Sequence, residues 1–333
     1  MSTDAIVDVR RAVRLELADV GASELVLVAC SGGPDSMALA LATRLERERV
    51  GAVIIDHGLQ PRSRELAEQT GELLRARGLD PVCVESVVIV ESGDGMEAAA
   101  RDARYRALHQ VSLRVGGAVV LLGQTLDDQA ETVLLGLARG SGTRSLAGMP
   151  RRRGKFRRPL LDVSRAVVHA SLPPDLPVID DPHNHDPRFA RVRVRDNVLP
   201  MLERELGPGI AAALARTAEL ARADSEALAE LVDEIGYDII MGASVPGDLD
   251  VDALEPLVRA VRSRIMRTWL IDGGVSAGRL SAEHVNRLDA LVTEWKGQGA
   301  VALPGGVEVV RDCGRLILRP LTSSRSQTPA KEN

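Results

Sequence analysis

Short apolar runs alternate with segments of helical periodicity along the first 140 residues of the chain. The runs that predict buried strands are Leu25–Cys30, Val50–Asp56, Pro81–Val90 and Ala118–Gly123. The segments that predict helices follow them at Asp35–Arg47, Arg62–Arg77, Met96–Val115 and Asp127–Ala138. Strands that alternate with helices in this way form right-handed βαβ units. We therefore expect an α/β fold with a mostly parallel, doubly wound sheet, and ligands beyond the carboxyl ends of its strands.

The pattern changes after Gly140, because residues 140–190 are rich in Gly, Pro and Arg and show little periodicity. Helices are predicted around Leu199 and at Ile210–Ile235, Leu254–Ile271 and Ala282–Trp295, and short strands at Ala300–Leu303, Val307–Val310 and Arg315–Leu318. We expect a first domain over residues 1–205, a helical linker over 206–245 and a small α+β domain over 246–320. The polar residues 321–333 are expected to form a disordered tail.

Composition narrows the class of protein. A length of 333 residues with 45% hydrophobic and 27% charged side chains is typical of a folded chain of about two domains. No apolar run approaches the ~20 residues that cross a bilayer, and the N-terminus lacks an apolar signal segment, so we expect a cytoplasmic protein without membrane contact. Cys30, Cys83 and Cys313 lie far apart and form no CxxC motif. This spacing argues against disulfides and against a cysteine-ligated metal centre.

Positive charge is concentrated in two places although the net charge is −5. The first cluster consists of Arg151, Arg152, Arg153, Lys155, Arg157 and Arg158, and the second of Arg188, Arg191, Arg193 and Arg195. The net charge argues against a uniformly basic nucleic-acid binder, but local patches decide whether a phosphate backbone is bound. From charge alone, solvated loops and a phosphate-binding surface are equally good interpretations.

The segment Ser31–Ser36, with the sequence SGGPDS, joins the first predicted strand to the first predicted helix. Gly32 and Gly33 allow positive φ angles and close backbone approach, and the helix directs unpaired N–H groups and its positive dipole end to the same place. No lysine follows as it does in a GxxxxGK[ST] loop, which disfavours transfer of a γ-phosphoryl group. The segment predicts a phosphate-binding loop, with a glycine-rich turn and serine N-cap as the structural alternative.

Further motifs, in order along the chain, make it resemble one family of phosphate-binding enzymes. The loop SGGxDS is the signature of the PP-loop ATP pyrophosphatases, and the remaining motifs resemble the tRNA(Ile)-lysidine synthases, in the short form without an extra C-terminal domain. These motifs are Asp56-His57-Gly58-Leu59, Glu97–Tyr105, Asp127–Thr132, Leu146–Met149, Arg158–Leu161, Asp181–Asn184, Arg191–Arg195 and Leu303–Gly306. The likeness runs from about residue 25 to residue 320.

The resemblance implies an ATP-dependent ligase that joins free L-lysine to C2 of the wobble cytidine of tRNA(Ile) with a CAU anticodon. The C2 oxygen would attack the α-phosphate of ATP, pyrophosphate would leave, and the lysine ε-amine would then displace AMP from the adenylated tRNA. Codon recognition would change from AUG to AUA. An amine with a pKa of about 10.4 must lose a proton before it attacks, so a nearby carboxylate could both orient it and accept that proton.

The matched motifs carry the predicted site residues. Those for ATP are Ser31, Gly32, Gly33, Pro34, Asp35, Ser36, Asp56, His57 and Gly123, and those for lysine binding and catalysis are Asp128, Glu131, Arg101 and Arg104. The candidate ligands of Mg²⁺ are Asp35 and Asp127. The candidates for tRNA binding are Arg151, Arg152, Arg153, Arg157, Arg158, Arg191, Arg193 and Arg195. Spacing alone leaves structural alternatives open, namely an Asx-type turn at Asp56 and an acidic first helical turn at Asp128 and Glu131.

One position departs from the family pattern. Gln124 stands where the family has a histidine after the glycine of GHxxDD, and a glutamine can form hydrogen bonds but cannot carry a proton. The general base is therefore undefined, and a non-catalytic nucleotide-binding protein stays an alternative. A tRNA thiolation enzyme is a second alternative, but such enzymes usually need paired cysteines. The sequence leaves open the oligomeric state, for which a homodimer is one candidate, and the tRNA positions that are read.

Overall fold

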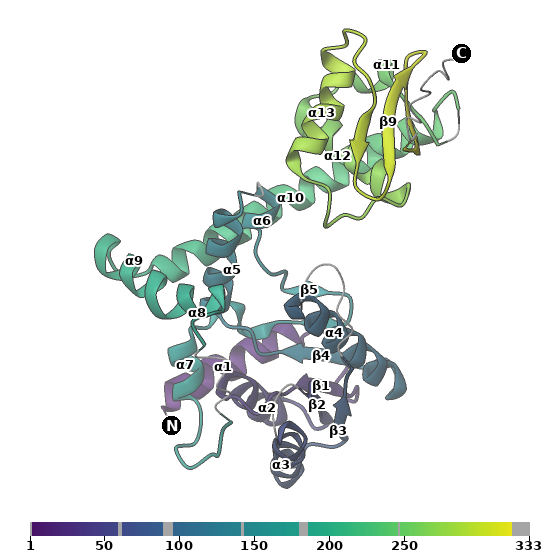
Figure 1. The fold of residues 1–333 in the computed structure, drawn as a ribbon. Helices are drawn as coiled ribbons and strands as arrows, with labels where there is room; N and C mark the ends of the chain where they lie inside the picture. Colours follow the sequence, from purple (N-terminus) through teal and green to yellow (C-terminus); the bar gives the residue numbers. More distant parts are fainter. Residues whose placement is uncertain are drawn as a thin grey trace, which may run out of the picture. The chain divides into compact units, whose positions relative to one another are not determined.

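The computed structural model describes residues 2–58, 62–88, 96–140, 143–179, 186–245 and 247–321, with the backbone alone for 96–98, 143, 144 and 241. The chain divides into two compact units, Met1–Arg222 and Ala223–Asn333 (Figure 1). Each unit has its own hydrophobic core.

Unit 1 contains a six-stranded sheet and the helices that cover it. Its strands are β1 (Val26–Ala29), β2 (Val50–Asp56), β3 (Val82–Ser86), β4 (Val119–Leu122), β5 (Arg152–Arg153) and β6 (Phe156–Arg157). Its helices are α1 (Thr3–Glu16), α2 (Pro34–Glu46), α3 (Ser63–Ala76), α4 (Met96–Arg114), α5 (Leu126–Ala138), α6 (Thr143–Leu146), η1 (Pro159–Asp162), α7 (Arg165–Ala170), α8 (Ala190–Arg193), the π-helix η3 (Val194–Val198) and α9 (Leu199–Leu206). The long helix α10 (Ile210–Met241) begins in unit 1 and ends in unit 2.

The strand order of the large sheet is β3-β2-β1-β4-β6-β5, and every pair except β5–β6 is parallel. The order reverses at β1, because β2 lies on one side of it and β4 on the other. In open parallel sheets, ligands bind beyond the carboxyl ends of the strands at such a reversal. The segments that follow β1 and β4 therefore form the expected binding position, and these are Ser31–Ser36, called the PP-loop after the family that its sequence resembles, and the start of α5.

Successive side chains of β1 pack alternately into two hydrophobic clusters, one on each face of the sheet. Val26 and Val28 pack with apolar residues of α1, α2 and α3, whereas Leu27 and Ala29 pack with Leu108 of α4 and its neighbours. Figure 1 accordingly shows α1 and α2 on one face of the sheet and α4 on the other. Successive residues of a strand point to opposite faces, so a strand covered on both sides must be apolar throughout, as the run Leu25–Cys30 is.

Unit 2 is a small α+β unit. Its strands are β7 (Leu249–Asp250), β8 (Val301–Leu303), β9 (Val307–Asp312) and β10 (Arg315–Pro320), and its helices are α11 (Val251–Leu254), α12 (Arg259–Asp272) and α13 (Ala282–Thr293), with the second part of α10. The strands form an antiparallel sheet in the order β7-β10-β9-β8. Its core joins Leu316 and Val309 of the sheet to Trp269 of α12 and Leu288 of α13.

The predicted fold class is confirmed, since a mostly parallel doubly wound sheet, a helical region and a small α+β unit are all present. The predicted strand Pro81–Val90 is shorter in the structure and ends at Ser86, with residues 89 and 90 outside the described part of the chain. Helices α1 and α7 and the β5–β6 hairpin were not predicted. The division into three domains differs from the two compact units, because α10 belongs to both of them. Residues 322–333 of the predicted tail lie outside the described residues.

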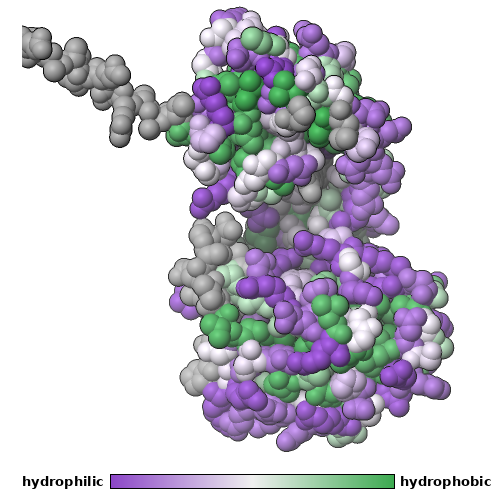
Figure 2. Space-filling model, turned by 90° about the vertical axis from the view of Figure 1, so that its right-hand side faces the viewer, coloured by the Kyte–Doolittle hydropathy of each residue, from purple (hydrophilic) through white to green (hydrophobic). Residues whose placement is uncertain are grey.

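The described surface carries both polar and apolar side chains. On the face drawn in Figure 2, hydrophobic and hydrophilic residues are interspersed. Among the described helices, none combines the length and the apolar character needed to cross a membrane.

Candidate active site

The PP-loop connects β1 to α2 and leaves the start of α2 without a side-chain cap. Gly33 is the N-cap residue and Pro34 opens the helix, so the first N–H groups have no side-chain acceptor. Ser36 donates from Oγ to the carbonyl of Gly33 at 2.9 Å and accepts from the N–H of Ser31 at 3.1 Å, which fixes the turn. Uncapped N–H groups at the positive end of a 13-residue helix form a site for an anion such as a phosphate.

Two glycines allow the close approach that this turn requires. Gly32 has φ +83°, and a Cβ there would lie 2.7 Å from Cδ1 of Ile179 and 2.8 Å from Oγ1 of Thr70. Gly123, at the end of β4, lies so close to α2 that a Cβ would be 3.2 Å from the backbone oxygen of Asp35. The ends of β1 and β4 therefore meet at the reversal of strand order, with Gly123 beside the first turn of α2.

Asp56 forms the Asx-type turn that the spacing left open. Its Oδ1 accepts from the N–H of Gly58 at 2.9 Å and its Oδ2 from Oγ of Ser86 at 3.2 Å, at the end of β2. Burial opposes its charge, but hydrogen bonds, that of Ser63 foremost, outweigh burial and hold the pKa of the Asp56 carboxyl below its ordinary value. The carboxylate is thus engaged in shaping the loop, with the half-buried His57 next to it.

Helix α5 begins with a capping box. Thr125 accepts at Oγ1 from the N–H of Asp128 at 3.4 Å, and Asp128 Oδ2 accepts from the N–H of Thr125 at 2.9 Å. This arrangement fixes the Asp128 side chain and leaves its other oxygen, Oδ1, for different partners. The structural alternative of an acidic first turn applies to Asp128 but not to Glu131, because the acids in the first turn of α5 are Asp127 and Asp128.

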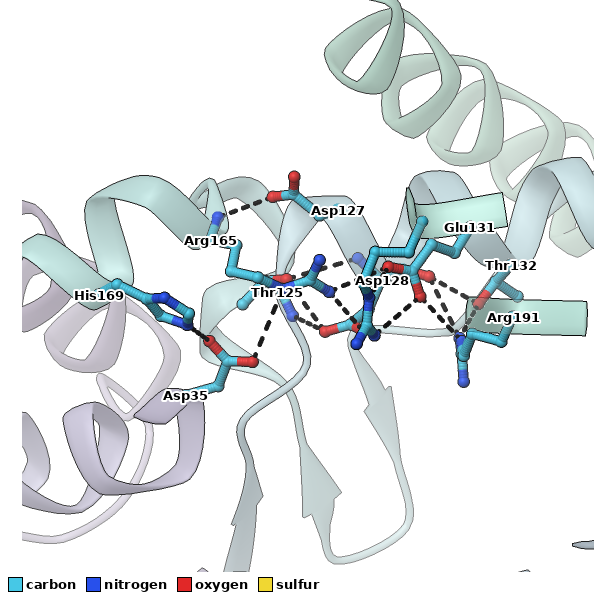
Figure 3. Close-up of polar contacts among 10 residues, drawn as sticks. Asp35, Thr125, Asp127, Asp128, Glu131, Thr132, Arg165, His169 and Arg191 are labelled. Atoms are coloured by element: carbon cyan, nitrogen blue, oxygen red, sulfur yellow. Dashed lines mark hydrogen bonds and ion pairs between the residues drawn. The ribbon is translucent and has the colours of Figure 1, made fainter. Parts of the chain in front are cut away.

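Glu131 is the centre of an ion-pair cluster (Figure 3). Its side chain is 0% exposed. Arg195 Nε lies 2.8 Å from Oε1, Arg191 Nε lies 3.0 Å from Oε2, and Arg165 Nη2 lies 3.1 Å from Oε1. Three guanidinium groups compensate this buried carboxylate, as a buried charge requires.

Arg165, the first residue of α7, connects the cluster to the PP-loop. Its Nη2 donates to Asp128 Oδ1 at 3.0 Å, and its backbone N–H donates to Asp127 Oδ2 at 2.7 Å. Its Nε lies 3.9 Å from Oδ2 of Asp35, whose Oδ1 lies 3.0 Å from Nε2 of His169. Burial opposes the charge of Arg165, but Asp128 and Glu131 outweigh it and raise the pKa of the guanidinium. The structure thus brings together four of the five predicted carboxylates, Asp35, Asp127, Asp128 and Glu131 (Figure 3), whereas Asp56 bonds Gly58 and Ser86 at the end of β2.

The predicted arginines of α4 lie around Tyr105. The guanidinium of Arg101 stacks 5.7 Å from the ring centroid, and the ring meets Phe156 edge to face. Arg104 is half-buried, and burial lowers the pKa of its guanidinium below the ordinary value, against the opposing effects of Tyr105 and Cys30. Cys30, whose interaction with Arg104 opposes this shift, directly precedes the segment Ser31–Ser36.

Most arginines predicted to bind tRNA form ion pairs or hydrogen bonds with other residues of unit 1. Arg152 lies 2.6 Å from Glu16 at the end of α1, and Arg157 lies 2.6 Å from Asp19 just beyond that helix. Arg151 bonds Asp162 of η1. Arg158 is 2% exposed and donates to the carbonyl of Pro150 and the hydroxyl of Tyr105. A buried guanidinium cannot contact a phosphate backbone, so Arg158 has a structural position instead.

Two predicted arginines remain exposed without a carboxylate partner among the described residues. Arg153 is exposed in the hairpin, and Arg193 donates to the carbonyls of Pro187 and Arg188. Arg191 and Arg195 belong to the Glu131 cluster. Among the described residues of unit 1, the predicted tRNA-binding arginines that lack a carboxylate partner are therefore Arg153 and Arg193.

The carboxylates suit a metal that is shared with a phosphate ligand better than a metal held by protein alone. No group of three or more His, Cys, Asp or Glu side chains with metal-binding geometry occurs among the described residues. Mg²⁺ normally keeps several waters and uses one or two carboxylates together with substrate phosphates. Asp35 fits that requirement, because it lies in the first turn of α2 beside the anion site.

Sequence reasoning missed Arg165, His169 and Thr125. Ser164 accepts from the N–H of Val167 and caps α7, so a serine before Arg165 was an available signal for a helix start. Nothing in the local sequence indicates that Arg165 reaches three carboxylates of other elements. The motif Asp181–Asn184, Leu59 and the side chain of Glu97 lie outside the described residues.

The chain is similar to known proteins along most of its length. Residues 8–202 match the PP-loop domain family, and residues 249–317 match the TilS substrate binding domain family. The tRNA(Ile)-lysidine synthase of Thermobifida fusca is 52% identical over 316 residues, which are 93% of this chain and 96% of that protein. Those of Streptomyces coelicolor and Nocardia farcinica are 49% and 44% identical, over 89% and 97% of this chain and 85% and 99% of their own.

A solved structure shares the fold at low identity. The U34-tRNA thiolase NcsA from Methanococcus maripaludis, solved with its [4Fe-4S] cluster, aligns with a TM-score of 0.53 and 19% identity over 66% of this chain and 80% of its own. At this identity the likeness supports the fold alone. The cysteines of the present chain are free, with Cys30 buried in unit 1 and Cys313 exposed in unit 2.

Proposed function

Because the chain belongs to the family of tRNA(Ile)-lysidine synthases, we propose how its residues divide the work of forming lysidine. The family are ligases that use ATP, and lysidine formation at the wobble position of tRNA is the function of this chain. One observation carries the proposal: the uncapped start of α2, the end of β4 and four carboxylates meet at the reversal of strand order.

The PP-loop binds the pyrophosphate part of ATP. The N–H groups at the start of α2 donate to the outer phosphates, and negative charge that develops on the leaving pyrophosphate meets the positive end of the helix. The turn is held by Ser36 in advance, so little reorganisation is needed when charge develops. Arg104 adds positive potential from the side of α4.

Mg²⁺ would be held by Asp35, with Asp127 as the second candidate, together with the phosphates. When bound, it supplies positive charge that neutralises the phosphate oxygens. The carboxylate of Asp35 is oriented by His169, which lies 3.0 Å from Oδ1.

The lysine amine binds at Asp128 and Glu131, whose oxygens face one position beside the PP-loop. The capping box orients Asp128, and the buried Glu131 adds a second negative charge. Asp128 is the better candidate to touch the amine, because its side chain is 14% exposed and that of Glu131 is 0% exposed. Arg101 on the exposed face of α4 is the candidate partner of the lysine carboxylate.

The tRNA meets unit 1 through Arg153 and Arg193, the exposed members of the predicted set. The match of residues 249–317 to a substrate binding domain supports a tRNA-contacting role for unit 2. The division into a catalytic part (1–205), a linker (206–245) and a substrate-selecting part (246–320) remains our proposal for the functional domains. A homodimer and a cytoplasmic location stay predictions.

The test is mass analysis of tRNA nucleosides after incubation of the full chain with ATP, lysine and tRNA(Ile). We expect lysidine together with release of AMP and pyrophosphate, and we expect Asp35→Ala to lose both products while Asp8→Asn, on the exposed side of α1, keeps them. Sulfur in the modified nucleoside would indicate thiolation instead. ATP binding without AMP release would indicate a non-catalytic protein and would contradict the proposal.

A further inference from the structure

The two carboxylates proposed for the lysine amine are bridged by a cation of the chain itself. A single nitrogen, Nη2 of Arg165, lies 3.0 Å from Oδ1 of Asp128 and 3.1 Å from Oε1 of Glu131. Figure 3 draws the polar contacts of this guanidinium with the two acidic side chains. A protonated primary amine also carries several N–H donors on one nitrogen, so it can donate to two carboxylate oxygens in the same way.

The rest of the cluster does not depend on Arg165. Glu131 keeps Arg191 at Oε2 and Arg195 at Oε1 when Arg165 is taken away. Asp128 keeps its capping box with Thr125 and a longer contact of 3.5 Å to Arg195. Removal of the Arg165 guanidinium would therefore free one position for a cation without dismantling the carboxylates that surround it.

We propose that the Arg165 guanidinium occupies the substrate-amine position of the free enzyme, and that lysine binds by displacing it. This inference rests on the proposed function, because it takes Asp128 and Glu131 as the amine site. The backbone of Arg165 is fixed by its hydrogen bond to Asp127 and by the Ser164 cap of α7, so only the side chain has to move.

The displaced guanidinium can bind a second group of partners near Asp35. Its Nε already lies 3.9 Å from Oδ2 of Asp35, in the first turn of α2 where the phosphates of ATP are proposed to bind. Phosphate oxygens accept planar, paired donors from arginine well. Bound ATP would thus draw Arg165 away from the amine position, which couples the affinities for ATP and lysine.

The cost of displacement lowers the affinity for lysine in the free enzyme. When only a fraction of molecules has the amine position open, the apparent dissociation constant rises by the inverse of that fraction. A variant without the competing cation should therefore bind lysine more tightly, although it has lost a charged residue from the active site. A residue that merely helped to assemble the site would give the opposite result.

The test is equilibrium dialysis of radiolabelled lysine against the full chain without ATP and tRNA. We expect Arg165→Met to lower the lysine dissociation constant about tenfold, Arg165→Gln to act in the same direction, and Arg165→Lys to stay near the wild type. Arg10→Met, which removes an arginine of α1 from its ion pair with Glu46 at the end of α2, should leave lysine binding unchanged. Unchanged or weaker binding in a folded Met or Gln variant would overturn the inference.

Two further measurements separate this inference from the proposed function. Asp128→Asn should weaken lysine binding in both the wild-type and the Arg165→Met background, and undiminished binding there would mean that the amine site lies elsewhere. A non-cleavable ATP analogue with a methylene between the α and β phosphorus atoms should tighten lysine binding in the wild type but not in Arg165→Met. An equal effect in both would overturn the displacement while leaving the amine site intact.

Discussion

Glu131 shows how burial changes the interpretation of a motif residue. In the sequence it is one of two carboxylates spaced for one helical face, which suggested a direct contact with lysine. In the structure it is fully buried and holds Arg165, Arg191 and Arg195 in one cluster. Its charge therefore supports the fold of the site as well as its electrostatic potential.

Replacement of Glu131 by glutamine tests this double role. Loss of one partner from a buried ion-pair cluster leaves uncompensated charge, so we expect Glu131→Gln to lower the free energy of unfolding by about 3 kcal/mol and to raise the KM for lysine. Urea unfolding and steady-state kinetics measure the two effects. Glu65→Gln, which removes an exposed pair with Arg62, should change stability by less than about 1 kcal/mol. A raised KM for lysine together with wild-type stability would show that Glu131 contacts lysine but does not stabilise the fold.

Gly32 is the residue at which the PP-loop tolerates no side chain. Its φ of +83° disfavours L-residues, and a Cβ would meet Ile179 and Thr70 at less than 3 Å. We expect Gly32→Ala to raise the KM for ATP more than tenfold and to cost about 2 kcal/mol of stability. Gly116→Ala is the matched control, because Gly116 also has a positive φ but has nothing within 4 Å of its Cβ position. Equal losses in both variants would show that backbone strain alone is responsible.

At the scale of elements, the end of α1 and the residues just after it bind the β5–β6 hairpin, which lies more than 130 residues later in the sequence. Glu16, whose side chain is 2% exposed, and Asp19 bind Arg152 and Arg157 of the hairpin. The hydrogen bond from Arg157 is the largest cause that lowers the pKa of Asp19 to about 2. The basic cluster that charge alone offered as an RNA surface thus has a large share of its charge used internally.

The pH dependence of stability follows from this shift. The pKa of Asp19 is lower in the folded chain than its ordinary value of 3.8, so its contribution is present above about pH 4 and is lost as the pH falls towards 2. We expect the difference in unfolding free energy between the wild type and Asp19→Asn to be largest at pH 5 and to shrink between pH 4 and pH 2. Asp8→Asn, on the exposed side of α1, is the control variant. A difference that is constant with pH would contradict the ion pair.

These elements also indicate what a sequence can predict. The strands β1 and β4 and the PP-loop are predictable, because a run that is buried on both faces must be apolar and the turn requires its own glycines. The hairpin is not, because its two-residue strands are held by Glu16 at the end of α1 and by Asp19 just beyond it, more than 130 residues away. The same holds for Arg165, whose role depends on carboxylates from two other helices.

For the whole molecule, the boundary between the units passes through a single helix. The sequence suggests a linker over 206–245, yet the residues of α10 beyond Arg222 contribute to the core of unit 2. Val232 is 5% exposed, and Ile235, Ile239 and Ile240 pack against the same cluster. Because each buried aliphatic side chain contributes about 1.5–3 kcal/mol, this part of α10 is a structural component of unit 2.

Truncated chains distinguish the two boundaries. A chain of residues 1–222 should be monomeric and unfold cooperatively, since it keeps both cores of unit 1. A chain of residues 1–245 should self-associate and bind a hydrophobic dye, because it carries the apolar side chains of α10 without their partners. Light scattering after size exclusion and dye fluorescence measure this difference.

Replacement of Val232, Ile235, Ile239 and Ile240 by glutamine should restore the monomer in the longer chain. If 1–245 is already monomeric and dye-free, α10 is an independent linker, and the boundary expected from the sequence describes the molecule better than the compact units do.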